Sequence, residues 1–195
     1  MKTLSLLIIL SFSALVLPMC KPSHAYDKYI KELDSLKIVV EQAIDHFKTI
    51  DSLRCYDAFS KQYTYNAFIT THVQDTVSKS SAEAMQAFFA TGKPLNNYLA
   101  MRPVWLAEAN ARVKQLSTLS TDLKNDNIET AEAVEFINEE KKQSEKIIEE
   151  LKVNTALLRK HLDLYAKNLP LIEAMIKERN SGQLPELIKP EIKLL

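Results

Sequence analysis

The histidines lack the neighbours that a metal site on a helix requires. The chain has four: His24, His46, His72 and His161. Metal sites in helical bundles commonly place a Glu three residues before a His on the same helix face. The last three histidines instead follow apolar residues at that spacing: Ala43, Ile69 and Leu158. HExxH, CxxC, CxxCH and calcium-loop patterns are missing as well, so we expect no metal ion and no cofactor.

One acidic residue adjoins a histidine, at Asp45 and His46. Neighbouring positions on a helix point about 100° apart and do not face each other, so this pair is better suited to a solvated surface than to acid–base catalysis. GxSxG and phosphate-loop patterns are also absent from the sequence. We therefore expect a protein that is not an enzyme.

The two cysteines, Cys20 and Cys55, allow different interpretations. Cys20 follows an apolar run and is a candidate lipidation site. Leu17, Pro18 and Met19 fit a lipoprotein signal poorly, since such signals normally place Gly, Ala or Ser before the Cys. Cys55 would then be alone in the mature chain and is interpreted as a small apolar side chain packed on a helix.

The first 25 residues have the pattern of a signal peptide. Lys2 precedes an apolar run that is too short to span a bilayer, and Ser23 and Ala25 provide small side chains before a cleavage point. We expect cleavage after Ala25 and export to the periplasm or the extracellular space, with a membrane-anchored lipoprotein as the alternative. No transmembrane span is expected in the mature chain.

Length and composition indicate one ordinary folded domain over residues 26–195. The chain has 195 residues, 46% of them hydrophobic and 26% charged. Its 25 basic residues equal its 25 acidic residues. Without a basic excess, nothing favours binding to nucleic acid. Only two glycines occur, which disfavours tight β-hairpins and glycine-rich phosphate loops.

Apolar residues spaced three and four apart predict long helices that pack along one another. The longest series, over 128–168, comprises Val134, Ile137, Ile148, Leu151, Leu158, Leu162 and Tyr165. A similar seam covers 94–124, and the polar break at 125–127 would make these two helices antiparallel neighbours. An N-terminal helix begins near Asp27, and its pattern continues less regularly to Phe59. The predicted fold is an all-α, elongated helical bundle, with a long antiparallel coiled-coil-like hairpin packed on the N-terminal helix.

Several element boundaries follow from local signals. Periodicity predicts a helix over 63–77 despite its β-branched and aromatic composition. Ser80 and Glu83 resemble a capping box that starts a short helix, Gly92 would end that helix with a positive φ, and Pro94 would forbid its continuation. Pro103 should kink or restart the next helix, and Pro170 should end the longest one. The tail, 184–195, is expected to pack in extended form or to stay loose.

A polar layer interrupts the seam of the longest helix at Lys141 and Ser144, where apolar residues are due. Antiparallel pairing about the turn places residues whose numbers sum to about 252 side by side. Glu108 could then reach Lys141 across a stretch of small residues. We interpret Glu108, Lys141 and Ser144 as a layer that fixes the register of the hairpin, or alternatively as part of a partner-docking surface.

The function that best fits these features is that of an exported, non-enzymatic bundle that binds another macromolecule, an unidentified protein of the cell envelope. Two alternatives stay open: a carrier of a small apolar ligand, and an enzyme of unrecognised type. Oligomeric state does not follow from the sequence.

Overall fold

A computed structural model describes residues 26–73 and 77–193, and within them every regular element is a helix. The helices are α1 (Asp27–Lys48), α2 (Ser52–His72), α3 (Lys79–Phe89), α4 (Gly92–Lys124) and α5 (Thr130–Arg179). The prediction of an all-α bundle is confirmed. The stretch rich in β-branched and aromatic residues is helical from Tyr63 to His72. The expected signal peptide, its cleavage after Ala25 and the lipidation candidate Cys20 lie outside the described residues.

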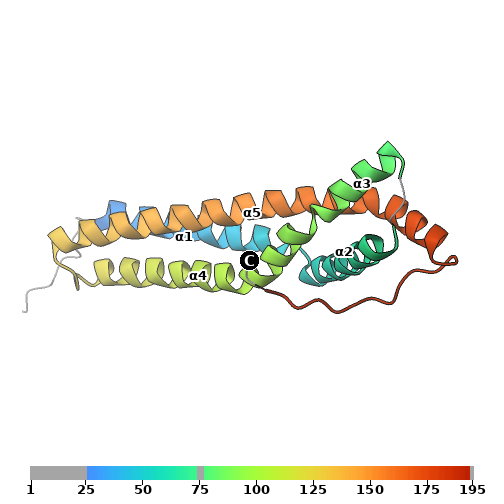
Figure 1. The fold of residues 1–195 in the computed structure, drawn as a ribbon. Helices are drawn as coiled ribbons and strands as arrows, with labels where there is room; N and C mark the ends of the chain where they lie inside the picture. The colour runs from blue at the N-terminus through green and yellow to red at the C-terminus, as the bar shows by residue number, and fades with distance from the viewer. Residues whose placement is uncertain (1–25, 74–76, 194–195) are drawn as a thin grey trace, which may run out of the picture.

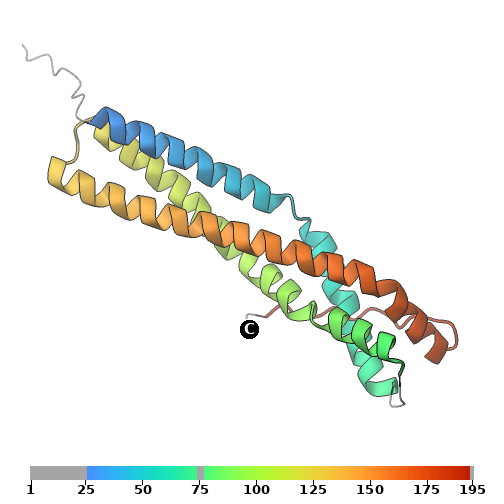
Figure 2. The same ribbon diagram turned by 90° about the horizontal axis from the view of Figure 1, so that it is seen from above.

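The helices form three rods that lie side by side (Figures 1 and 2). The first rod is α1 followed by α2, the second is α3 followed by α4, and the third is α5 alone. Successive rods run in opposite directions. With 50 residues, α5 is about 75 Å long and lies along both of the other rods.

Two hydrophobic cores fill the space between the rods. The larger lies among α1, the start of α2, α4 and α5, and its fully buried side chains include Leu33, Val40, Phe47, Leu95, Leu116, Ile137, Ile147 and Leu151. The smaller lies among α2, α3 and the C-terminal part of α5, and contains Tyr65, Ile69, Phe88, Ile172, Met175 and Ile176. The apolar face of α1 therefore lies in the larger core, and α5 contributes to both cores.

The first rod is broken where the sequence pattern had suggested one helix to about Phe59. It turns at Thr49 and Ile50, and Asp51 caps the start of α2 by accepting hydrogen bonds from the backbone N–H groups of Leu53 (2.8 Å) and Arg54 (3.3 Å). Such a cap satisfies donors that have no partner inside the helix. The break leaves Leu53 exposed, which explains why the apolar pattern loses regularity there.

The N-cap of α3 lies two residues before the predicted one. Ser78, rather than Ser80, is the N-cap and accepts from the backbone N–H of Ser81 at 3.1 Å. Glu83 pairs with Lys79 at 3.9 Å. Ser78 has the same side-chain chemistry as Ser80, so propensity alone did not distinguish the two.

Gly92 is not a positive-φ cap but the first residue of α4. Only Ala90 and Thr91 separate α3 from α4, and both have right-handed helical dihedrals. The short helix consequently continues the line of α4 and does not fold across the end of the bundle. Pro94 is accepted in the first turn of α4, because the N–H groups there have no helical partner to lose.

Pro103 and Pro170 both lie inside continuous helices, so the predicted end at Pro170 is wrong. Of the kink or restart predicted at Pro103, the restart does not occur, and α4 bends in its N-terminal part (Figure 1). Each proline removes one backbone hydrogen bond and crowds the preceding turn. Packing of apolar side chains on both sides of Pro170, such as Tyr165 and Ile172, stabilises the helix across that defect. Toward its C-terminal end α5 bends (Figure 1), as expected of a proline within a helix.

The tail packs in extended form, one of the two predicted alternatives. From Gly182, which has a φ of 85°, it returns along the bundle toward the N-terminal part of α4 (Figure 1). Thr64 accepts from the N–H of Ile188 at 2.9 Å. Asn96 accepts from the N–H of Lys193 at 3.2 Å and donates to its carbonyl at 2.5 Å.

Gly92→Ala should lower the free energy of unfolding by about 1–3 kcal/mol, the usual range for overpacking. A Cβ at this position would lie 2.7 Å from Cδ of the buried Gln62 side chain, although Ala is otherwise the better helix former. Urea unfolding measures the change. Gln62→Ala provides the control. Alone it should be destabilising, and in the Gln62→Ala background the further change Gly92→Ala should be close to neutral. Additive losses in the double variant would contradict the proposed contact.

Candidate docking surface beside α5

Helices α4 and α5 pair in the register expected from the sequence. Arg112 and Glu140, whose numbers sum to 252, form an ion pair with 3.4 Å between Nη1 and Oε2. Ala109 is fully buried between the rods, so the small side chains permit close approach of the two helices. This ion pair and the apolar seams together set the register of α4 against α5.

Lys141 does not reach across to Glu108. It forms an ion pair and hydrogen bond with Glu32 of α1, and Glu108 makes no ion pair within the described part of the chain. The hydrogen bond from Lys141 is the main cause that lowers the pKa of Glu32 below its usual value, with Lys28 adding a smaller attraction. Lys141 therefore links α5 to α1, whereas the sequence pattern had suggested a link to Glu108 on α4.

Ser144 is fully buried, and its hydroxyl has no hydrogen-bond partner among residues 26–73 and 77–193. Most buried hydroxyl groups are hydrogen-bonded, often to the carbonyl four residues earlier in a helix. Thr155 on the same helix does this, donating to the carbonyl of Leu151 at 2.7 Å. Ser144 thus places a polar hydroxyl group in the apolar seam without the hydrogen bond that usually offsets its burial.

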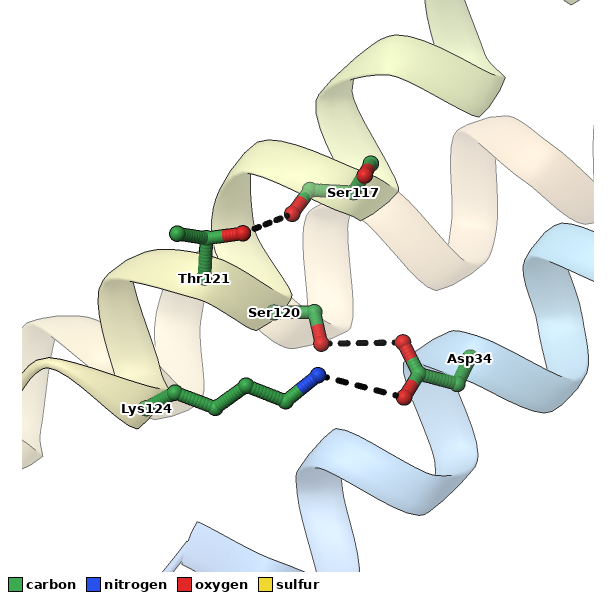
Figure 3. A network of polar contacts seen from close by, with 5 residues as sticks. All are labelled: Asp34, Ser117, Ser120, Thr121 and Lys124. Atoms are coloured by element: carbon green, nitrogen blue, oxygen red, sulfur yellow. Dashed lines mark hydrogen bonds and ion pairs between the residues drawn. The ribbon is translucent and has the colours of Figure 1, made fainter.

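A further polar link joins α1 to α4 (Figure 3). Asp34 accepts from the hydroxyl of Ser120 at 2.9 Å and from Nζ of Lys124 at 3.4 Å. Ser120 is buried, whereas the side chains of Asp34 and Lys124 are about half exposed. Together with the Glu32–Lys141 and Arg112–Glu140 pairs, this contact links each pair of rods in this half of the bundle.

Two grooves flank the N-terminal half of α5. The groove between α1 and α5 has a volume of about 530 Å³, and Glu32, Leu36, Val39 and Lys141 are among its lining residues. The groove between α4 and α5 has a volume of about 520 Å³. Its lining residues are Ala111, Lys114, Gln115, Thr118, Leu119, Asp122, Ile128, Phe136 and Glu140.

The α4–α5 groove contains an exposed aromatic side chain and a buried leucine. Phe136 is 49% exposed in it, and the buried side chain of Leu119 contributes to its lining. Charges of both signs, Lys114, Asp122 and Glu140, surround these apolar groups. An apolar strip with charged edges is suited to an amphipathic helix of a partner.

The residues singled out for catalysis or metal binding are placed in unremarkable surroundings. Asp45 and His46 are both exposed. His72 contacts the carbonyl of Phe68 through Nδ1 at 2.9 Å. Burial lowers the pKa of His161. Burial also raises the pKa of Cys55 to about 11, which keeps its thiol protonated and agrees with its interpretation as a packed side chain.

Sequence reasoning missed Glu32, Asp34, Arg112 and Phe136 as members of this surface. The available signal was their position beside the seams: charged residues that flank the apolar stripe of a packed helix commonly pair with a neighbouring helix. To predict which residues form these ion pairs, one must know which rod lies beside each edge of the apolar stripe. That information depends on the three-rod arrangement, which the pairwise hairpin prediction did not contain.

Ser144→Ala and Ser120→Ala make the same chemical change at two buried sites and should have opposite effects. Ser144→Ala removes an unpaired hydroxyl and should raise the free energy of unfolding by about 1 kcal/mol. Ser120→Ala removes the hydrogen bond to Asp34 and should lower it by about 1–2 kcal/mol. Urea unfolding of both variants checks the pair, and destabilisation by Ser144→Ala would show that its hydroxyl has a partner in solution.

Within residues 26–73 and 77–193, no helix is both long enough and apolar enough to cross a membrane. The same residues contain no group of three or more histidine, cysteine or acidic side chains arranged to hold a metal ion. Comparison of the chain with protein-family models, with curated proteins and with solved structures finds no match.

Proposed function

We propose that this protein is exported and acts as a non-enzymatic binding module, which holds another protein of the cell envelope in the α4–α5 groove. The observation that carries the proposal is Phe136, a large aromatic side chain left half exposed inside a groove with charged edges. Exposed aromatic groups with a polar rim are typical anchors of protein interfaces.

The groove favours a helical partner segment. Its walls are two antiparallel helices with apolar side chains between them, a setting suited to an amphipathic helix that lies in a groove. Lys114 on one wall and Asp122 further along that wall offer charges of opposite sign, which would orient a partner helix carrying complementary charges.

The groove is supported by interactions that do not depend on a partner. The Arg112–Glu140 ion pair spans α4 and α5 with both side chains largely buried. Leu116, Leu119 and Leu123 anchor the same part of α4 in the core. A preformed binding surface loses less conformational entropy on association.

Export is proposed from the N-terminal sequence, where Lys2, the apolar run and the small residues before Tyr26 match a signal peptide. A lipid anchor at Cys20 remains the alternative mode of attachment. Either form would leave the mature bundle outside the cytoplasm, where envelope proteins are its available partners.

Phe136→Glu tests the proposal, because a charge at the anchor should abolish docking while leaving the core intact. A photo-crosslinking residue at Thr118, in the groove, should capture one defined envelope protein in the native cell. Phe136→Glu should remove that adduct. Val153→Glu, on the same helix and similarly exposed at 51% but outside the groove, should retain it. Circular dichroism checks that both variants fold.

Persistence of the same adduct in Phe136→Glu would contradict docking through the groove. So would the absence of any groove-specific adduct when Thr118 carries the crosslinker. Equal loss in both variants would indicate that the negative charge acts through the general surface of α5.

A further inference from the structure

A separate cleft lies near the middle of the bundle, between α4 and α5. Its volume is about 210 Å³, smaller than the docking grooves. Tyr98, Met101 and Trp105 on α4 form one wall, and Leu157 and Leu158 on α5 form much of the other. The spacings of three and four residues on α4 place Tyr98, Met101 and Trp105 on a single helix face.

The aromatic wall of this cleft is held in place from behind. Trp105 packs against Phe47 of the core, with ring centroids 5.9 Å apart in a T-shaped arrangement. Tyr98 packs against Phe47 at 5.6 Å and donates from its hydroxyl to the carbonyl of Ile50 at 3.3 Å. The wall is thus fixed before a ligand arrives, which is usual for small-molecule sites.

Three polar side chains, those of Lys93, Asn97 and Asn154, line the otherwise mostly apolar cleft. Asn154 lines it and donates through Nδ2 to the carbonyl of Glu150 at 2.8 Å, which leaves its amide oxygen available as an acceptor. Asn97 also lines it, and its amide makes no hydrogen bond within the described residues. Lys93 is the single charged residue among the lining residues, and its ammonium forms no ion pair within residues 26–73 and 77–193.

We propose that this cleft binds a small amphipathic carboxylate, with its ring or short hydrocarbon chain against Trp105 and Met101 and its carboxylate toward Lys93. The size agrees, because an apolar cavity of about 150 Å³ accommodates a benzene ring. The unpaired cation supplies the charge complementarity, and the two amides supply hydrogen bonds to the polar end. This site is independent of the groove that contains Phe136.

The site contains its own reporter, since Trp105 is the only tryptophan in the chain. Titration of the folded full-length mature protein with 3-phenylpropionate should give a saturable change in tryptophan fluorescence. A ligand of this size is expected to bind with a Kd of about 1 mM or tighter. The neutral analogue 3-phenylpropanamide should bind more weakly, and acetate, which lacks the ring, should produce no saturable change.

Two substitutions separate the apolar and the charged parts of the site. Lys93→Met should weaken binding of the carboxylate about 2- to 5-fold, the size expected for an exposed charge pair, and leave binding of the amide unchanged. Leu157→Asp should reduce carboxylate binding by about 10-fold or more, because it adds a negative charge and removes apolar surface at the lining of the cleft. Leu157 is 44% exposed, so the substitution is compatible with folding.

Val153→Asp is the matched control, one helical turn from Leu157, comparably exposed and outside the cleft. It should change the affinity less than 2-fold. Lack of saturable binding for both phenyl compounds would overturn the site. Equal weakening by Leu157→Asp and Val153→Asp would overturn its placement, and equal affinity for the acid and the amide in the wild type would overturn the carboxylate assignment.

Discussion

Burial of the apolar stripe on α5 is the constraint on which the rest of the fold depends. A 50-residue helix cannot shield its stripe alone, and helices in folded proteins gain most of their stability from tertiary packing. The other two rods cover it over its length: α1 and α4 toward the N-terminal side, α2 and α3 toward the C-terminal side. The break at Thr49–Asp51 and the near-continuity of α3 with α4 allow both rods to follow α5.

Polar contacts determine how the rods are aligned within that hydrophobic frame. Apolar seams alone permit sliding by one heptad, whereas paired charges beside a seam specify register and partner. Glu32, Asp34 and Arg112 each connect one rod to a particular neighbour. The unpaired hydroxyl of Ser144 lies in the same region and contributes polarity without a bond. The proposed docking groove lies beside these contacts, where α4 and α5 are held together most specifically.

The fold class, the antiparallel α4–α5 pairing and its register could be predicted from sequence, because apolar periodicity and a short polar turn determine them directly. The behaviour of prolines could not. A proline normally ends a helix, and the continuation of α5 past Pro170 depends on flanking residues such as Ile172, which pack in one core with Tyr65 and Phe88 from distant segments. Gly92 resembled a helix end, yet its lack of a side chain matches a close approach of Gln62. Lys141 was identified as a polar seam residue, but its partner Glu32 lies 109 positions away.

Native-state hydrogen exchange along α5 tests most directly whether this helix unites both cores in one cooperative unit. Amides of 147–151 and of 172–176 lie in different cores but on the same helix. We expect that, with increasing denaturant, both sets converge on the same opening free energy, that of global unfolding. Convergence of residues 172–176 on a separate and lower value, with the change located at Pro170, would contradict it.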